Sequence, residues 1–284
     1  MSKVVILTDS ASDIDESLKS SLGIEMVPLK VSFGTETFVD GELSASAFYE
    51  KLKQSAALPT TSQPSPLDFV EKYNEIIEKH GKDVQIIAIL LSSALSGTYQ
   101  SAVIAKNMLD QAADITLIDS KKASFIHGLC VVEAARAAQA GQSKQQILDA
   151  IDRYLQDVQV YFVVDTLTYL QKGGRIGAAS ALIGSLLNIK PILTLTPAGT
   201  VAPFDKVRGS KKAQARMMEA LKTYAGDSPV KTAVIHADAK AEAEAILLKV
   251  KEEFNVTEAY ISEIGAIVGT HTGPGTLGCM IVKA

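Results

Sequence analysis

Residues 84–102 read VQIIAILLSSALSGTYQSA, and this stretch decides the fold. Residues 84–91 form a near-continuous apolar run, which is typical of a strand buried on both faces of a sheet. The run stops at Ser92-Ser93, and a helical pattern begins near Tyr99. Open α/β sheets place ligands where a buried strand leads through a polar turn into a helix, and a helix N-terminus favours an anion. We therefore expect an anionic group near Ser93; the alternative is that these serines only cap the helix.

The segments on either side of this stretch alternate between strand and helix patterns. In the first half we expect strands at 4–7, 26–33 and 115–120, and helices at 14–22, 67–79, 99–112 and 123–140. This spacing indicates a mainly parallel sheet flanked by helices. In the second half, strand patterns at 158–164, 191–196, 201–207, 230–236 and 260–264 alternate less regularly with helices. We predict an α/β protein with two α/β domains, residues 1–157 and 158–284, the second with a mixed sheet.

Composition excludes several classes of protein. The 284 residues are 47% hydrophobic and 21% charged, which is typical of a globular chain with a large core. The net charge of −4 argues against a general nucleic-acid binder. Two scattered cysteines, the absence of a signal peptide and the absence of a long apolar run predict a cytoplasmic protein. No metal-ligand spacing, Walker A sequence, dinucleotide fingerprint or Gly-x-Ser-x-Gly elbow occurs, so we expect neither a metal nor a cofactor.

Three polar segments are candidate site loops. Asp9 ends the first predicted strand, where it either serves a site or forms a turn, and the sequence favours neither. Residues 58–66 read LPTTSQPSP, and their three prolines predict a stiff loop that presents hydroxyls, with a linker as the alternative. His271 lies in the glycine-rich segment 265–278, where it is able to hold a carboxylate, although a lone histidine is more often structural.

Two further segments differ from their surroundings in charge. Residues 178–189 read AASALIGSLLNI, which predicts an uncharged helix that is buried or lines an apolar cavity. The interval 206–222 contains six basic residues and only one acidic residue, so the basic residues form either a local positive patch or a solvated helix face. Hydroxyls, one arginine and one histidine beside an apolar wall describe a site for an amphiphile with an anionic head.

Five motifs in a fixed order make the chain resemble the DegV family, the bacterial fatty-acid-binding proteins that serve a fatty acid kinase. They are TDS at 8–10, PTTSQPS at 59–65, SSALSGT at 92–98, LQKGGRI at 170–176 and GTHTGPG at 269–275. The match covers essentially the whole chain. The resemblance implies a non-catalytic carrier that buries one long-chain fatty acid, of the palmitate or oleate type, in a tunnel between two α/β domains. A separate ATP-dependent kinase would phosphorylate the acid, and the carrier would take the acyl phosphate toward phospholipid synthesis, with at most transient membrane contact.

The resemblance also implies roles for particular residues. Thr61 and Ser93 would hold the carboxylate. A supporting network would comprise Thr60, Ser62, Ser96, Gly97, Arg175 and His271. The acyl chain would lie against Ala178, Leu182, Ile183, Leu186, Leu187 and Ile189. Local positive charge makes Arg208, with Lys206 and Lys211, our candidate surface for docking the kinase.

Two other functions compete with the carrier. The first is a hydrolase or transferase that acts on a lipid-like substrate, with Ser93 as nucleophile and His271 as base. The second is a transcription regulator, against which the acidic balance and the lack of a basic recognition helix count. A carrier releases its ligand unchanged unless kinase and ATP are added, so turnover separates the first alternative from the carrier.

Overall fold

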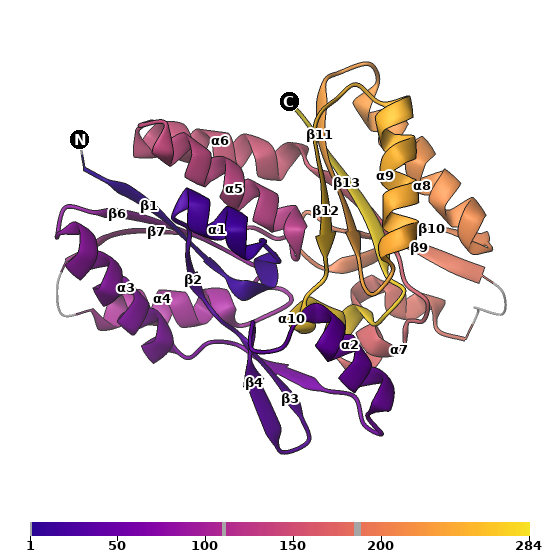
Figure 1. The fold of residues 1–284 in the computed structure, drawn as a ribbon, viewed down its shortest axis with the longest axis horizontal. Helices are drawn as coiled ribbons and strands as arrows, with labels where there is room; N and C mark the ends of the chain where they lie inside the picture. Colours follow the sequence, from indigo (N-terminus) through magenta and orange to yellow (C-terminus); the bar gives the residue numbers. More distant parts are fainter. Residues whose placement is uncertain (1, 110–111, 185–188) are drawn as a thin grey trace.

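The computed structural model describes residues 2–109, 112–184 and 189–284 (Figure 1). Sheet A has four parallel strands in the order β2-β1-β6-β7. They are β1 (Val4–Asp9), β2 (Glu25–Val27), β6 (Gln85–Leu90) and β7 (Asp114–Asp119). The apolar stretch that opened the sequence analysis forms β6, an interior strand with no solvent exposure from Ile86 to Leu90. The prediction of a parallel sheet in the first half is confirmed.

Helices cover both faces of sheet A (Figure 1). On one face, α3 (Pro66–His80) packs against α4 (Thr98–Met108). On the other face, α1 (Glu16–Leu22) and α5 (Phe125–Gln139) pack together, and α6 (Lys144–Asp157) packs on α5. The α5 helix carries ten buried residues, so it forms the centre of the molecule and not its surface.

Sheet C holds six strands in the order β10-β9-β8-β13-β11-β12, with parallel and antiparallel pairs, as the sequence predicted. Its strands are β8 (Gln159–Val163), β9 (Ile189–Leu195), β10 (Val201–Arg208), β11 (Val230–His236), β12 (Val256–Glu263) and β13 (Leu277–Lys283). The helices α8 (Ser210–Ala225) and α9 (Lys240–Glu253) pack on this sheet. Both α5 and α6 also contact sheet C, so they lie between the two sheets (Figure 1).

A small third sheet, in the order β4-β3-β5, corrects one sequence prediction. The single strand expected at 26–33 is two strands, β2 in sheet A and β3 (Lys30–Phe33) in the small sheet. Pro28 separates them, because proline has no N–H to donate and fixes its own φ. The other strands are β4 (Glu36–Val39) and β5 (Thr60–Ser62), and β5 lies within the proline-rich loop. The helix α2 (Ala45–Gln54) begins after Ser44, whose side chain caps it by accepting the backbone N–H of Ala47.

The prediction of one helix at 178–189 is wrong for the residues of this segment that the structure describes. A 3-10 helix, η2 (Gly177–Leu182), follows the short α7 (Thr168–Lys172), and Ile189 already belongs to β9. Gly177 and Gly184 have φ of +51° and +87°, a region outside the right-handed helix, so they bound the segment at both ends. Leu186 and Leu187 lie outside the described residues.

One hydrophobic core joins the two halves of the chain. It includes Ile6 and Ile89 of sheet A, Leu129 of α5, and Val160 and Met280 of sheet C. Sheet A is built from residues before 157 and sheet C from residues after it. The boundary at residue 157 stays a prediction, because this core crosses it. Within the described ranges, no helix has the length and apolar character needed to cross a membrane.

Candidate ligand-binding site

A cavity lies between the two halves, and both halves supply its walls. Most of the lining is apolar, including Leu29, Leu91, Ile126, Phe162, Ile235, Ile264, Ile267 and Val268. The polar lining residues are Thr61, Ser96, Ser124, Arg175, His271, Thr272 and Thr276. Mostly apolar walls with a few polar groups are typical of a small-molecule site.

The first polar contact of the cavity joins the two halves directly. Thr61 Oγ1 of β5 lies 2.8 Å from His271 Nε2 of α10 (Ala266–Thr272). Thr61 is partly buried, whereas its neighbours Thr60 and Ser62 are exposed. This alternation follows from the strand, in which successive side chains point to opposite faces. Thr60 and Ser62, predicted as supporting residues, therefore do not line the cavity.

His271 is held as a neutral imidazole. Burial, and to a smaller extent the nearby positive charge of Arg175, lower the pKa of His271 from 6.5 to about 4. The loop of Gly173 lies against the ring, since a Cβ at Gly173 would stand 2.3 Å from His271 Nδ1. Gly173 has φ of −73°, so space and not backbone conformation requires glycine there.

Arg175 brings a fixed positive charge to the same end of the cavity. Its Nε donates to the carbonyl of Leu95 at 2.9 Å, and its Nη1 donates to the carbonyl of Gly173 at 2.6 Å. One bond reaches the turn before α4 in the first half, and the other stays within its own loop. Two bonds to backbone carbonyls hold the guanidinium in place, so it is preorganised for an anion.

The structure does not place Ser93 at the cavity, and its role at the carboxylate stays a prediction. Ser93 is exposed, and its Oγ donates to Asp119 Oδ2 at the end of β7. Ser96, three residues along the same turn, lines the cavity instead. Its Oγ lies 2.9 Å from Thr98 Oγ1. Gly97 does not line the cavity; a Cβ there would meet the Gln63 side chain, so it allows β5 and α4 to approach.

The described residues that we predicted for the acyl-chain wall lie away from this cavity. Ala178 and Ile183 are exposed, and neither they nor Leu182 and Ile189 line the cavity. The sequence missed several lining residues instead, among them Leu29, Ser124, Thr272 and Thr276. Ser124 follows the carboxyl end of β7, so the sheet-edge rule that selected Ser93 applied to it as well.

Asp9, which the sequence left undecided, serves the fold. It has no solvent exposure, and its carboxyl accepts bonds from the backbone N–H groups of Ala11 and Leu91 at 3.0 and 2.7 Å. Burial raises the pKa of Asp9 to about 7. Asp9 does not line the cavity.

The pairing that a serine hydrolase needs is not formed. Ser93 bonds to Asp119, and the hydroxyl partner of His271 is Thr61. Nucleophile and base must lie within hydrogen-bond reach of one another. In the part of the chain that the structure describes, no group of three or more His, Cys, Asp or Glu residues is arranged to hold a metal ion.

Comparison with known proteins adds the family. The family model described as "Uncharacterised protein, DegV family" matches residues 3–284. A DegV domain-containing protein of Halalkalibacterium halodurans is 40% identical over 280 residues, which cover 98% of each chain.

Two solved structures resemble the whole chain. One is described as fatty acid binding of a DegV family protein from Thermus thermophilus, with a TM-score of 0.92, 35% identity and coverage of 99% and 100% of the two chains. The other is described as DegV, a fatty acid binding protein from Bacillus subtilis, with a TM-score of 0.89, 35% identity and full coverage of both chains. From the family match over nearly its whole length and these relatives, the chain belongs to the DegV family.

Proposed function

We propose that this protein is a carrier that binds one long-chain fatty acid in the cavity between its halves. The observation that carries the proposal is the cavity itself, with apolar walls and one cluster of Thr61, Ser96, Arg175 and His271. Burying each methylene contributes about 0.8 kcal/mol, so a chain of about fifteen methylenes contributes roughly 12 kcal/mol before ordering costs. The related structures from Thermus thermophilus and Bacillus subtilis, described as fatty acid binding, support the same ligand class.

The carboxylate would lie among the polar cluster. In this proposal Thr61 and Ser96 donate their hydroxyls to it, and Arg175 supplies the opposing charge. An unpaired carboxylate costs several kcal/mol to bury, so the cation and the hydroxyl donors offset a penalty that the apolar walls cannot. His271 keeps Thr61 oriented as its hydrogen-bond partner.

A matched series of variants tests the head-group assignment. Protein purified from cells should carry a stoichiometric fatty acid, detected as a mass difference between native and denaturing spectra and identified after solvent extraction. Thr61→Ala and Ser96→Ala each remove one donor to a charged group, so each should weaken palmitate binding by about ten- to a hundredfold. Ser93→Ala, from the same turn as Ser96, should leave the affinity within about threefold.

The outcomes separate the alternatives. A protein that arrives empty and also refuses palmitate and oleate contradicts the carrier. A Ser93→Ala variant that loses binding while Ser96→Ala keeps it would return the head group to our first assignment. Release of a cleaved or altered lipid without kinase or ATP would favour the hydrolase.

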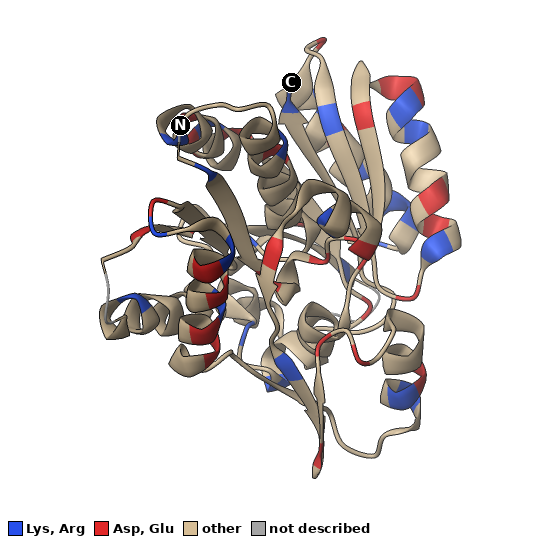
Figure 2. Ribbon diagram, turned by 60° about the vertical axis from the view of Figure 1, so that its left-hand side comes forward, with Lys and Arg blue, Asp and Glu red and all other residues tan. Residues whose placement is uncertain are grey.

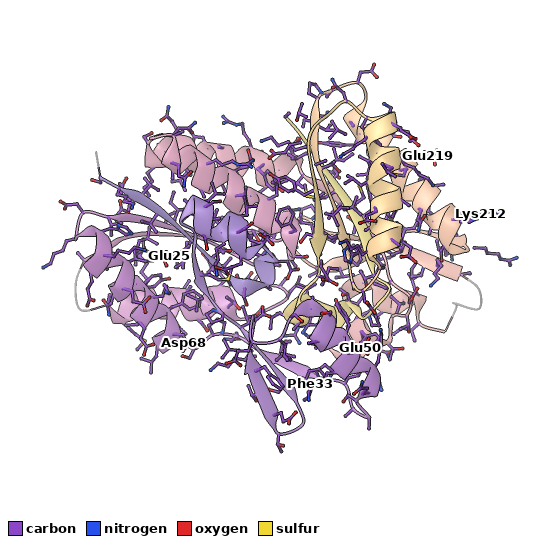
Figure 3. The ribbon with its side chains drawn as sticks, viewed as in Figure 1. Glu25, Phe33, Glu50, Asp68, Lys212 and Glu219 are labelled. Atoms are coloured by element: carbon purple, nitrogen blue, oxygen red, sulfur yellow. The ribbon has the colours of Figure 1, made fainter. Side chains whose placement is uncertain are left out.

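The remaining steps of the proposal involve a partner. A fatty acid kinase would phosphorylate the bound carboxylate with ATP, and the acyl phosphate would pass toward phospholipid synthesis. We propose that the kinase docks on the surface formed by the end of β10 and the start of α8, which carries Lys206, Arg208, Lys211 and Lys212. All four are exposed, and no ion pair to them is found among the described residues. Lys212 extends away from the body of the molecule at the start of α8 (Figure 3).

The neighbouring Arg216 serves as a contrast, because it bonds to Asp205 and Glu219 and stacks over Phe204. Elsewhere acidic and basic residues are interspersed along the outer helices (Figure 2). The four basic residues at the end of β10 and the start of α8 are therefore available to an acidic surface on the kinase.

Reversing the charges of this surface tests the docking step. Lys206→Glu with Arg208→Glu should slow phosphorylation of bound palmitate by a factor of about ten or more at low salt, because opposite charges steer and hold the partners. Binding of palmitate itself should not change. The control is the same double change at Lys249 and Lys251 of α9, which should leave the rate unaltered. Equal rates for the wild type and the Lys206/Arg208 variant would rule this surface out.

A further inference from the structure

Asp13 connects two walls of the cavity, and the head-group cluster does not account for it. Asp13 lies between η1 (Ser10–Ser12) and α1. Its Oδ2 accepts the hydroxyl of Ser124, the residue before α5. Its Oδ1 accepts the backbone N–H of Gly265, the residue before α10, at 3.0 Å. One carboxyl group therefore binds the first turns of two helices that come from the two halves of the chain.

Asp13 and Ser124, which bond to each other through their side chains, both have an unusual backbone conformation. Asp13 has φ of 49° and ψ of 33°, and Ser124 has φ of 54° and ψ of −157°. Positive φ costs free energy in residues other than glycine, and it persists only where the surroundings determine the conformation. Asp13 is in the left-handed region that aspartate tolerates, whereas Ser124 is in a region that residues other than glycine rarely adopt, so its bond to Asp13 helps to hold the Ser124 backbone.

Residues 12–13 are closely packed on two sides. A Cβ on Gly265 would lie 2.8 Å from Asp13 Oδ1, and a Cβ on Gly128 of α5 would lie 2.2 Å from the carbonyl oxygen of Ser12. The backbone carbonyl of Asp13 also accepts the hydroxyl of Ser262 at 3.1 Å. Residues 12–13 thus lie wedged between α5 and the connection from β12 to α10.

The helix that begins at Gly265 carries His271. Its middle is pressed against α2, because a Cβ on Gly269 would meet the hydroxyl of Tyr49 at 2.6 Å. Its end places His271 Nε2 at 2.8 Å from Thr61 Oγ1. Ile267 and Val268, on the same helix, line the cavity. A shift at the start of so short a helix displaces the histidine and the wall together.

We infer that Asp13 is a positioning residue for the fatty-acid site: by anchoring the starts of α5 and α10, it holds His271 against Thr61. The inference rests on the proposed function, in that the cavity is taken to hold a fatty acid. A carboxyl group suits this role because its two oxygens contact two donors at once. Asparagine at this position is able to make both contacts, because its oxygen accepts the N–H of Gly265 and its amide donates to Ser124 Oγ. Alanine makes neither contact.

The test compares Asp13→Ala with Asp13→Asn by two measurements. The first is the pKa of His271, followed by NMR through its imidazole protons. In Asp13→Ala this pKa should rise from about 4 toward 6.5, because the ring leaves its buried place. The second is palmitate affinity, which should fall about tenfold in Asp13→Ala. Asp13→Asn should leave the pKa of His271 unchanged and the affinity within about threefold.

Glu258→Gln is the matched control for loss of a contact between the halves. Glu258 of β12 accepts bonds from Arg136 of α5 at 2.8 and 3.0 Å, and it does not line the cavity. This variant should lower stability and leave both measurements unchanged. If the role of Asp13 is purely structural, Asp13→Ala should also lower stability and leave the pKa of His271 and the palmitate affinity unchanged. That result overturns the inference.

Two further outcomes stay informative. If the wild type binds no palmitate, the proposed function fails, while the pKa of His271 still decides whether Asp13 positions the ring. If Asp13→Ala does not fold, Gly265→Ala takes its place, since the added Cβ pushes the start of α10 off Asp13. Gly265→Ala should raise the pKa of His271, and an unchanged value overturns the inference.

Discussion

Replacing Arg175 with leucine is expected to lower palmitate affinity by a factor of about one hundred or more at pH 7.5, the cost of leaving a buried carboxylate without its cation. Hexadecanol, which has the same chain and no charge, should bind about as well as before. Arg175 is the one Lys or Arg among the described residues that line the cavity, so no other lining residue supplies a permanent cation in its place. Isothermal titration with both ligands measures the effect.

The same substitution should make binding depend on pH. The wild type pairs an ionised carboxylate with a permanent cation, so its affinity should be level between pH 6 and 8. In Arg175→Leu the bound acid is favoured in its neutral form, and palmitate should bind more tightly as pH falls. The pKa of His271 should also rise from about 4, because the positive charge of Arg175 contributes to lowering it. A His271 imidazole with a higher pKa becomes positively charged at a higher pH, and this charge adds to the increase in palmitate affinity as pH falls.

Arg175→Lys separates charge from geometry. Lysine restores the charge without the planar fork, so its affinity should lie between the wild type and leucine variants. An Arg175→Leu variant that binds palmitate within threefold of the wild type would place the carboxylate elsewhere in the cavity.

Gly128→Ala should destabilise the fold by about 2 kcal/mol or more, although alanine is the better helix former. Gly128 lies inside α5, where helix propensity alone predicts a gain of about 1 kcal/mol. Against this, the new Cβ would lie 2.2 Å from the carbonyl oxygen of Ser12, and within 3.1 and 3.2 Å of Phe125 and Ile14 side-chain atoms. Overpacking of this kind costs about 1–3 kcal/mol, and more where the obstacle is backbone. The clash therefore outweighs the propensity.

Urea unfolding of both proteins measures the difference. Gln145→Ala, on the exposed side of α6, is the control and should change the free energy of unfolding by less than about 0.5 kcal/mol. A Gly128→Ala variant more stable than the wild type would mean that residues 12–14 yield, and that their contact with α5 is loose.

The sequence predicted what depends on local pattern. The apolar run at 84–91 identified an interior strand because parallel sheets bury both faces of their strands. The helices expected at 14–22 and 67–79 are observed as α1 and α3, because side-chain caps and the backbone freedom of glycine act locally. The motifs placed Thr61, Arg175 and His271, and all three line one cavity.

Other features of the fold and the site depend on contacts between residues that are far apart in the sequence. Ser93 and Ser96 share one turn, and no local pattern tells which of them faces inward. Asp119, at the end of the neighbouring strand, bonds to Ser93 and turns it outward. The role of Asp13 depends on partners 111 and 252 residues away, which spacing cannot reveal. The apolar segment at 178–189 is helical by composition, but positive φ just before it at Gly177 and within it at Gly184 prevents a regular helix.

The position of β13 has a consequence for how the protein is made. This strand, Leu277–Lys283, lies between β8 and β11 and pairs antiparallel with both. Met280 and Val282 from it also enter the core shared with β1 and α5. A ribosome adds about 5–20 residues per second, so β8 and β11 are both synthesised before the strand that pairs with them.

Until then, β8 and β11 each have an unpaired edge, and unpaired edges invite aggregation. A nascent chain must keep these edges apart from other chains until translation reaches residue 283, and a premature stop before 277 leaves them open for good. β13 therefore closes the middle of sheet C, and a chain that stops before Leu277 is expected to expose both edges to chaperones and proteases instead of folding as a slightly shortened protein.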